Sequence, residues 1–155
     1  MEFADTHCHL NFEPLSSSLK EVLDRARQHA VVNILMPAVD LETSRQVIAL
    51  SEEDSNLFCA IGVHPNSSLS WNKQTLSELR KLTEHPKVKA IGEIGLDYYR
   101  NRAPTEIQIQ VFRQLLDLAF ETGLPVIVHN RSASVDTLPL LWTWRSELVK
   151  NAAPQ

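Results

Sequence analysis

Short apolar runs alternate with amphipathic stretches along the chain. The apolar runs, which we interpret as strands, are Phe3–Asp5, Val31–Met36, Leu57–Val63, Val88–Gly92 and Val126–His129. Their β-branched and nearly all-apolar character is typical of strands buried on both faces of a parallel sheet. Strands that alternate with helical patterns indicate βαβ units. The pattern therefore predicts an α/β fold of about five strand–helix units.

The amphipathic stretches between the strands carry recognisable helix starts. Apolar residues recur in them at helical spacing, so each stretch can pack one face against the sheet. Three pairs have the spacing of a capping box: Ser18 with Glu21, Thr75 with Glu78, and Thr105 with Gln108. A fifth helix is expected from Ser134 to Val149, with Pro139 near its first turn. No linker divides the chain, so we expect residues 1–155 to form one domain.

An open doubly wound sheet and a barrel both accommodate five strand–helix units. An open sheet would usually bind its ligand at a helix N-terminus behind a Gly-rich loop. The chain has only four glycines and no such loop. The barrel is therefore favoured, as an incomplete TIM (β/α)8-type barrel with about five βα units present.

Composition and charge restrict the possible functions. Hydrophobic residues make up 43% and charged residues 22% of the chain, as in ordinary folded domains. The formal net charge of -4 argues against a broad basic surface for nucleic acid, so a polyanionic substrate would have to be attracted locally. No apolar run approaches the roughly 20 residues of a membrane span, and the N-terminus lacks the features of a secretion signal. We expect no membrane association and a cytoplasmic location, or a nuclear one in a eukaryote.

Two histidines with metal-ligand spacing follow the first predicted strand. His7 and His9 are two residues apart, and side chains alternate along an extended segment, so both rings can reach one cation. Neutral imidazole is a common ligand of zinc and other divalent metals. An isolated pair of this kind is equally compatible with two surface histidines.

Further candidate ligands occupy the same structural position in later units. His64 follows the third predicted strand, Glu93 follows the fourth, and His129 ends the fifth. The carboxyl ends of the strands in a βα barrel converge on one face, where active sites lie. We therefore expect these residues to meet His7 and His9 around a common centre.

Four motifs contain these residues. They are Asp5-Thr6-His7-Cys8-His9-Leu10, Gly62-Val63-His64-Pro65, Gly92-Glu93-Ile94-Gly95-Leu96-Asp97-Tyr98-Tyr99, and Val128-His129 followed by Arg131. In this order they resemble the successive signatures of the TatD family of metal-dependent hydrolases, within the amidohydrolase-like barrels. The resemblance covers essentially the whole chain, and the glutamate segment is its most specific part.

The resemblance implies a centre of two divalent metal ions, which would be Mg, Mn or Zn. His7 and His9 would bind one ion, His129 would bind the other, and Glu93 would bridge both as the catalytic carboxylate. The implied activity is hydrolysis of phosphodiester bonds in DNA or an oligonucleotide, often from the 3' end. Two ions roughly 3.5 to 4 Å apart suit that reaction, because together they activate water and stabilise charge on the attacking and leaving oxygens.

Two residues are expected to contact the substrate. The family's histidine that corresponds to His64 lies near the substrate phosphate, and we assign His64 that role, with a structural histidine as the alternative. Arg131, and also Arg100, could bind phosphate through bidentate hydrogen bonds or be solvated surface residues. Asp97 could shape the pocket, but a structural role is favoured.

The resemblance also implies that part of the barrel lies outside this chain. A barrel of this kind has eight strands in about 250 residues, and the family's later metal-binding histidine and its water-orienting aspartate have no counterpart among these 155 residues. We therefore expect impaired activity and self-association through exposed sheet edges. Two alternatives stay open: a catalytically inactive fragment or subunit, and an amidohydrolase-like enzyme that cleaves a small C–N or ester substrate.

Overall fold

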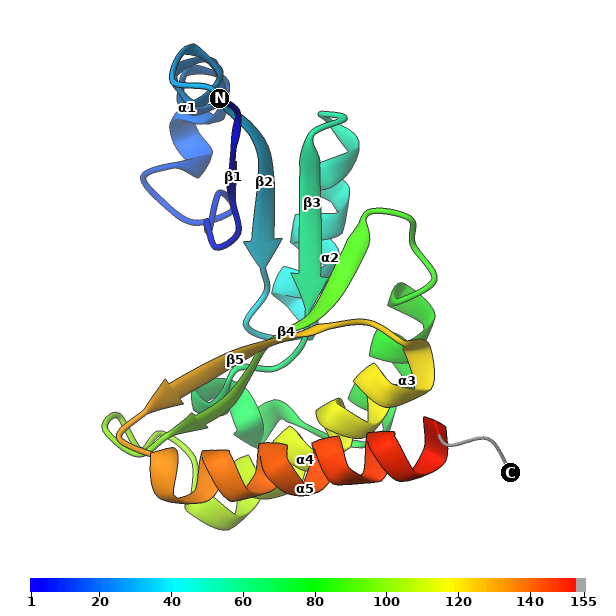
Figure 1. Cartoon of the computed structure of the whole chain (residues 1–155). Helices are drawn as coiled ribbons and strands as arrows, with labels where there is room; N and C mark the ends of the chain where they lie inside the picture. The colour runs from blue at the N-terminus through cyan, green and yellow to red at the C-terminus, as the bar shows by residue number, and fades with distance from the viewer. Residues whose placement is uncertain (153–155) are drawn as a thin grey trace.

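Strands and α-helices alternate along the computed structural model, which describes residues 1–152 (Figure 1). The strands are β1 (Phe3–Asp5), β2 (Val31–Pro37), β3 (Leu57–Ile61), β4 (Val88–Asp97) and β5 (Val126–Arg131). The helices are α1 (Leu19–Gln28), α2 (Leu41–Glu52), α3 (Lys73–Leu82), α4 (Thr105–Thr122) and α5 (Ser134–Ala152). Two short 3-10 helices, η1 (Ser16–Ser18) and η2 (Pro65–Ser70), lie in the connections. The predicted α/β class and the order of the units are confirmed.

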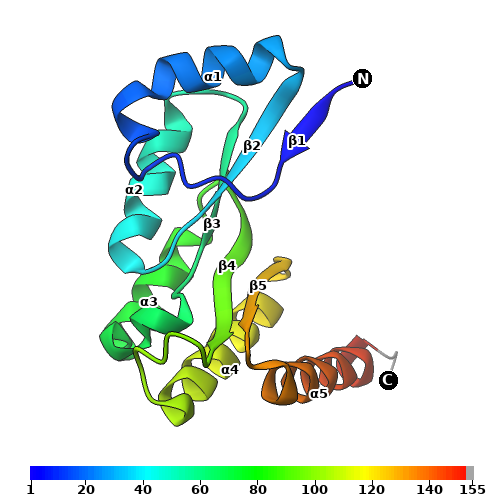
Figure 2. The same ribbon diagram turned by 90° about the vertical axis from the view of Figure 1, so that its left-hand side faces the viewer.

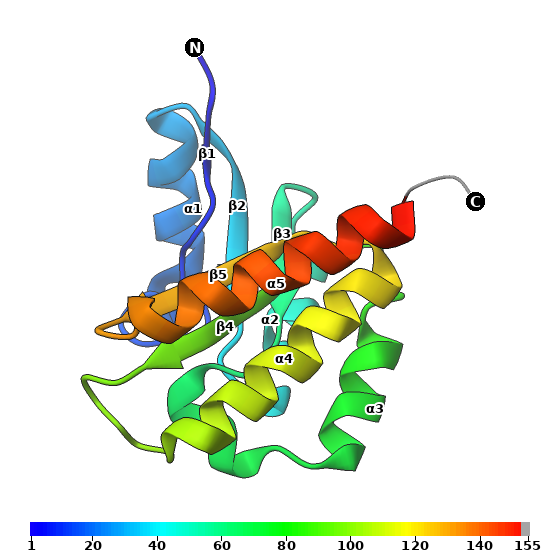
Figure 3. The ribbon, with the colours of Figure 1, turned by 60° about the horizontal axis from the view of Figure 1, so that its bottom comes forward.

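The five strands form one parallel sheet in the order β1-β2-β3-β4-β5. Each strand is hydrogen-bonded to its neighbours in the sequence, as in a barrel wall. The sheet curls, and α1, α2 and α3 lie on its outer side (Figure 2). Helices α4 and α5 run side by side along β4 and β5 (Figure 3). The expected incomplete barrel is therefore confirmed as a curled half-barrel.

The hydrophobic core lies between the sheet and the helices outside it. Its buried members include Ile61 and Ile91 from the strands and Phe112 and Leu115 from α4. Within the described residues, no helix combines the length and the apolarity needed to cross a membrane.

Burial of the strands differs from the prediction at the two edges of the sheet. β4 is buried almost throughout, as expected, whereas all of β1 is exposed and no residue of β5 is fully buried. Within the described residues, β1 pairs only with β2 and β5 pairs only with β4. The edge strands are more exposed because each has a neighbour on one side only.

β4 continues past its predicted end at Gly92 and ends at Asp97. The prediction stopped the strand where the apolar run meets a charge, but Glu93 is 9% exposed and lies inside the strand. The register with β5 shifts between Ile91 and Ile94, as in a β-bulge. Bulges near active sites change the direction of a side chain. Glu93 lies within this bulge, and its side chain lines the cavity described below.

None of the three predicted capping boxes forms. Ser18 lies at the N-cap of α1 without a side-chain cap hydrogen bond. The side chain of Asn72, not Thr75, caps α3, and α4 begins after Pro104, which has no side-chain cap. The side chain of the buried Gln108 instead bonds to the backbone of Asp97, at the end of β4, and of Ala103 in the following loop. Capping-box spacing alone did not locate the first residue of these helices, because that residue also depends on where the preceding strand and loop end.

Candidate metal centre

The predicted metal ligands lie together at the carboxyl end of the sheet. His7 and His9 follow β1, Glu93 lies on β4 and His129 lies on β5. All four line one cavity of about 510 Å³, and His64, which directly precedes η2, lines it too. The convergence follows from the parallel strand order, which brings consecutive strand ends to the same face.

Glu93 stands at the centre of this group. Its Oε2 atom lies 3.4 Å from Nε2 of His7 and 4.0 Å from Nε2 of His9. Its Oε1 atom lies 2.9 Å from Nδ1 of His129. Two groups of possible donor atoms result, one of His7, His9 and Glu93 and the other of His64, Glu93 and His129, each with its atoms within 4.8 Å of one another. Glu93 belongs to both groups, which is the position of a bridging carboxylate.

The donor set fits a divalent transition metal. Two ligand atoms bound tetrahedrally at about 2.1 Å from zinc would lie roughly 3.4 Å apart. The His7–Glu93 contact has this separation, and the His9–Glu93 contact is slightly longer. Two imidazoles and a carboxylate are also a donor combination found in catalytic zinc sites. The residues of the first group can therefore hold an ion with little movement.

The pleat of β4 arranges the side chains that face His129. Glu93, Gly95 and Asp97 are spaced by two, so they project from the same face of the strand. Gly95 pairs with His129 in the register, and the imidazole contacts a carboxylate on each side, Glu93 through Nδ1 and Asp97 through Nε2. Gly95 has a φ of +138°, and a Cβ atom there would lie 2.0 Å from the carbonyl oxygen of His129. Only glycine allows the two strands to approach this closely.

Asp97 lies within the site, although the sequence interpretation favoured a merely structural role. Its side chain accepts hydrogen bonds from the backbone N–H groups of Tyr99 and Arg100, from Asn66 and from His129. Burial would raise the pKa of the Asp97 carboxyl, but these bonds hold the pKa below its usual range. The sequence signal for Asp97 is its spacing of four residues from Glu93, because on an extended strand this spacing places both side chains on the same face.

The charges of the site are mutually dependent. Burial would raise the pKa of Glu93, but the hydrogen bond with His129 and the nearby His64 and His7 hold that pKa below its usual range. The same hydrogen bond raises the pKa of His129 against the effect of burial. Glu93 is thus an ionised carboxylate surrounded by imidazoles, which suits a cation-binding centre.

The hydrogen bonding of His64 differs from that of the other histidines in the cavity. Its Nδ1 atom accepts the backbone N–H of Asn66 at 3.0 Å, and its ring centroid lies 4.2 Å from that of His129. Burial, followed by the charge of His129, lowers the pKa of His64 to about 4. A neutral ring whose Nδ1 accepts a hydrogen bond carries its proton on Nε2. His64 is therefore set to donate a hydrogen bond, not to offer a lone pair to a metal.

Three arginines line the same cavity: Arg100, Arg102 and Arg131. The guanidinium of Arg131 lies 4.1 Å over the ring of Tyr99, an exposed residue after β4. Arg102 was missed by the sequence interpretation, although it follows β4 closely enough for the strand-end argument to have included it. The group forms a local basic wall beside the histidines.

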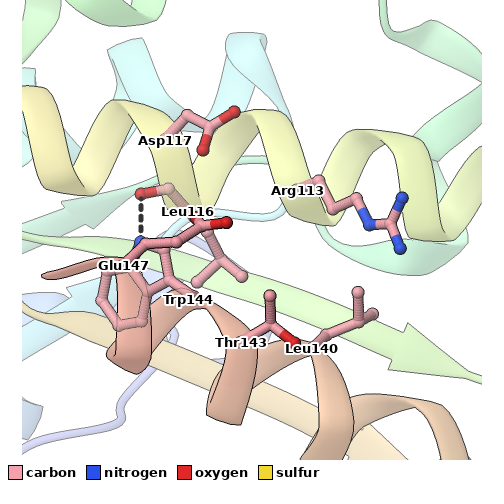
Figure 4. Close-up of a pocket in the computed structure, with 7 residues that line it drawn as sticks. All are labelled: Arg113, Leu116, Asp117, Leu140, Thr143, Trp144 and Glu147. Atoms are coloured by element: carbon pink, nitrogen blue, oxygen red, sulfur yellow. Dashed lines mark hydrogen bonds between the residues drawn. The ribbon is translucent and has the colours of Figure 1, made fainter. Parts of the chain in front are cut away.

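A second hollow of about 500 Å³ lies between α4 and α5, away from the strand ends (Figure 4). There the indole of Trp144 donates a hydrogen bond to the carbonyl of Leu116 at 3.0 Å. Both groups of possible metal donors in the described part of the chain lie in the histidine-lined cavity instead. The candidate metal site is therefore the cavity at the strand ends.

A curled parallel sheet with a His/Glu cluster at the carboxyl ends of its strands is the arrangement of metal-dependent hydrolases built on βα barrels. The sequence model of the TatD related DNase family matches residues 4–152. The chain belongs to this family of metal-dependent hydrolases.

Known relatives agree with this assignment. An uncharacterised metal-dependent hydrolase, YabD of Bacillus subtilis, is 39% identical over 137 residues, which are 88% of this chain and 54% of that protein. A protein of Erwinia amylovora named 3'-5' ssDNA/RNA exonuclease TatD is 36% identical over 130 residues, 83% of this chain and 50% of its own. The crystal structure of the TatD homologue YjjV from Escherichia coli superposes with a TM-score of 0.86 at 35% identity, over 92% of this chain and 56% of that one. The chain spans about half the length of these relatives.

Proposed function

We propose that this protein holds two divalent metal ions and hydrolyses phosphodiester bonds of DNA or an oligonucleotide, starting from the 3' end. The observation that carries the proposal is the position of Glu93, whose two carboxylate oxygens face two separate groups of histidines. The name of the Erwinia amylovora relative, an exonuclease on single-stranded DNA and RNA, supports the choice of substrate.

The contacts of Glu93 support a metal-binding role for each histidine. His7 and His9 would hold one ion through Nε2, together with Oε2 of Glu93. His129 would hold the second through Nδ1, together with Oε1 of Glu93. Two divalent ions, which would be Mg, Mn or Zn, would supply a nucleophile from water near neutral pH and would stabilise charge on the attacking and leaving oxygens. The lowered pKa of Glu93 keeps the bridging carboxylate ionised.

The remaining cavity walls suit an anionic substrate. Arg100, Arg102 and Arg131 can bind phosphate oxygens through paired N–H donors. His64 adds an Nε2–H donor, as its backbone contact with Asn66 indicates. These groups provide the local attraction that a chain of net charge -4 needs for a polyanion. They favour a phosphodiester over the neutral C–N or ester substrate of an amidohydrolase.

An impaired or inactive chain is the second candidate, and one observation favours it. If His64 donates to the substrate, the second ion keeps only Glu93 and His129 as donors from the described residues. Catalytic zinc sites commonly have three protein ligands. We therefore expect the ion at His7 and His9 to bind more tightly than the ion at His129, and activity of the 155-residue chain to be weak.

Metal titration and a cleavage assay on the 155-residue chain test the proposal. Isothermal titration with Mn²⁺ should show two unequal sites, and end-labelled single-stranded DNA should be shortened from its 3' end only when Mg²⁺ or Mn²⁺ is present. Glu93→Gln should weaken metal binding at least about tenfold, because changes to groups that only support a ligand already cost 10- to 100-fold. His85→Gln is the matched control, since His85 contacts Glu52 outside the site.

The outcomes separate the candidates. Chelator-sensitive cleavage that Glu93→Gln abolishes would support the nuclease. Metal binding without cleavage would identify an inactive subunit. Cleavage that persists in a chelator would contradict the metal mechanism.

A further inference from the structure

Asp97, the last residue of β4, is buried and has hydrogen-bond partners at both carboxylate oxygens. It is 1% exposed, although burying a carboxylate is costly unless its oxygens are satisfied. Oδ1 accepts the backbone N–H groups of Tyr99 at 3.0 Å and Arg100 at 2.8 Å. Oδ2 faces the side-chain amide of Asn66 and Nε2 of His129, both at 3.2 Å.

These contacts exclude Asp97 as a direct metal ligand. An ionised carboxylate has about four lone-pair sites, and all four are directed at hydrogen-bond donors here. Asp97 is also absent from both groups of possible metal donors. Its effect on the centre must therefore pass through His129.

Each ring nitrogen of His129 faces a carboxylate: Nδ1 lies 2.9 Å from Oε1 of Glu93 and Nε2 lies 3.2 Å from Oδ2 of Asp97. An ionised carboxylate only accepts hydrogen bonds, so in the absence of a metal ion either nitrogen can donate. A divalent ion bound by Glu93 and His129 would need the lone pair of Nδ1, so Nδ1 would give up its proton. Nε2 would then keep its proton, with Asp97 as the acceptor. The contact with Asp97 thus holds the ring with Nδ1 toward Glu93.

We propose that Asp97 is a positioning residue of the metal centre, which accepts a hydrogen bond from Nε2 of His129 and so holds Nδ1 toward the second divalent ion. The inference rests on the proposed metal centre. Hydrogen bonds that fix the tautomer and orientation of a metal-binding histidine commonly govern metal affinity. The backbone contacts of Tyr99 and Arg100 hold the carboxylate itself in place.

Nitrogen NMR and metal titration test this role. In the Zn²⁺-loaded protein, the ¹⁵N signals of His129 should show a proton on Nε2 and none on Nδ1. Asp97→Asn keeps the size of the side chain. If the amide oxygen takes over the two backbone contacts, the NH2 group faces Nε2 of His129. An NH2 group can only donate, so it favours the tautomer with the proton on Nδ1. Replacement of the orienting Asp in serine proteases has this effect. Zn²⁺ affinity at the second site should fall 10- to 100-fold, with the site of His7 and His9 little changed.

Gln108→Leu is the control for a purely structural effect. The side chain of Gln108 bonds to the backbone N–H and carbonyl of Asp97. The variant therefore removes support for the end of β4 but leaves the contact between Asp97 and His129 in place. It should lower the melting temperature yet keep the Nε2–H tautomer and the Zn²⁺ affinity. An equal loss of affinity in both variants would overturn the proposal.

The wild-type measurement tests this role even if Asp97→Asn does not fold. A His129 proton on Nδ1 in the Zn²⁺-loaded wild-type protein would overturn it. If the wild-type protein bound no divalent ion, the proposed function would fail and the role toward the ion with it, whereas an Nδ1 proton beside intact metal binding would refute the Asp97 role alone.

Discussion

Gly95 lies on β4 between Glu93 and Asp97, opposite His129 on β5. Its missing side chain lets the backbone of β5 come close enough for one imidazole to contact both carboxylates. The geometry around His129 therefore depends on a residue that takes no part in the chemistry.

Gly95→Ala should damage the site and the fold together. The added Cβ would lie 2.0 Å from the carbonyl oxygen of His129, and the backbone conformation disfavours a side chain. We expect a loss of about 3 kcal/mol in the free energy of unfolding and weaker metal binding at His129, measured by urea unfolding and calorimetry. Gly123→Ala is the control, because Gly123 also has a positive φ but has nothing within 4 Å. It should cost about 1 kcal/mol and leave metal binding unchanged; similar losses in both variants would contradict this account.

At the scale of elements, α2 begins with the one complete capping box among the described helices. The side chain of Asp40 accepts the backbone N–H of Thr43 at 2.8 Å, and the hydroxyl of Thr43 accepts the backbone N–H of Asp40 at 2.9 Å. The box was not predicted from sequence because Thr43 stands where Glu or Gln is usual. It anchors the connection that follows β2 next to the cavity wall at Val39.

Asp40→Ala should destabilise the protein, whereas Ser18→Ala should not. Loss of a working N-cap costs about 1 kcal/mol, and Ser18 makes no cap hydrogen bond despite its favourable sequence position. Urea unfolding followed by tryptophan fluorescence would show a lower midpoint for the first variant and, for the second, a change within about 0.5 kcal/mol. Equal shifts would show that the cap assignments are wrong.

At the scale of the whole molecule, the curled sheet has two open edges within its described residues. β1 and β5 each pair on one side only, and an unpaired strand is a template for pairing with another chain. Phe3 on β1 is 52% exposed. These features motivate the proposal that copies of this chain associate through the sheet edges.

Self-association should therefore depend on concentration and on β1. Light scattering after size-exclusion chromatography should show a mass that rises with concentration. Phe3→Lys should reduce this rise, because a charged edge strand resists pairing. Phe120→Lys is the matched control, since Phe120 is 45% exposed on α4. A monomer at every concentration, or equal effects of the two variants, would refute association through this edge.

The sequence by itself determined the alternation of strands and helices and indicated the candidate metal-binding residues at the strand ends. Both are local properties. Apolar periodicity depends on neighbouring residues, and once a strand has been predicted, the residues at its end are known as well. Parallel strands then place those ends on one face, so the sequence alone groups His7, Glu93 and His129.

Only the tertiary structure decided how β4 and β5 fit together. The bulge at Glu93, the close approach at Gly95 and the contact of Asp97 with His129 arise from pairing between segments more than thirty residues apart in the sequence. The inclusion of Arg102 in the cavity and the exposure of β1 are also set by which segments become neighbours. Such features depend on non-local packing, which periodicity along the chain does not encode.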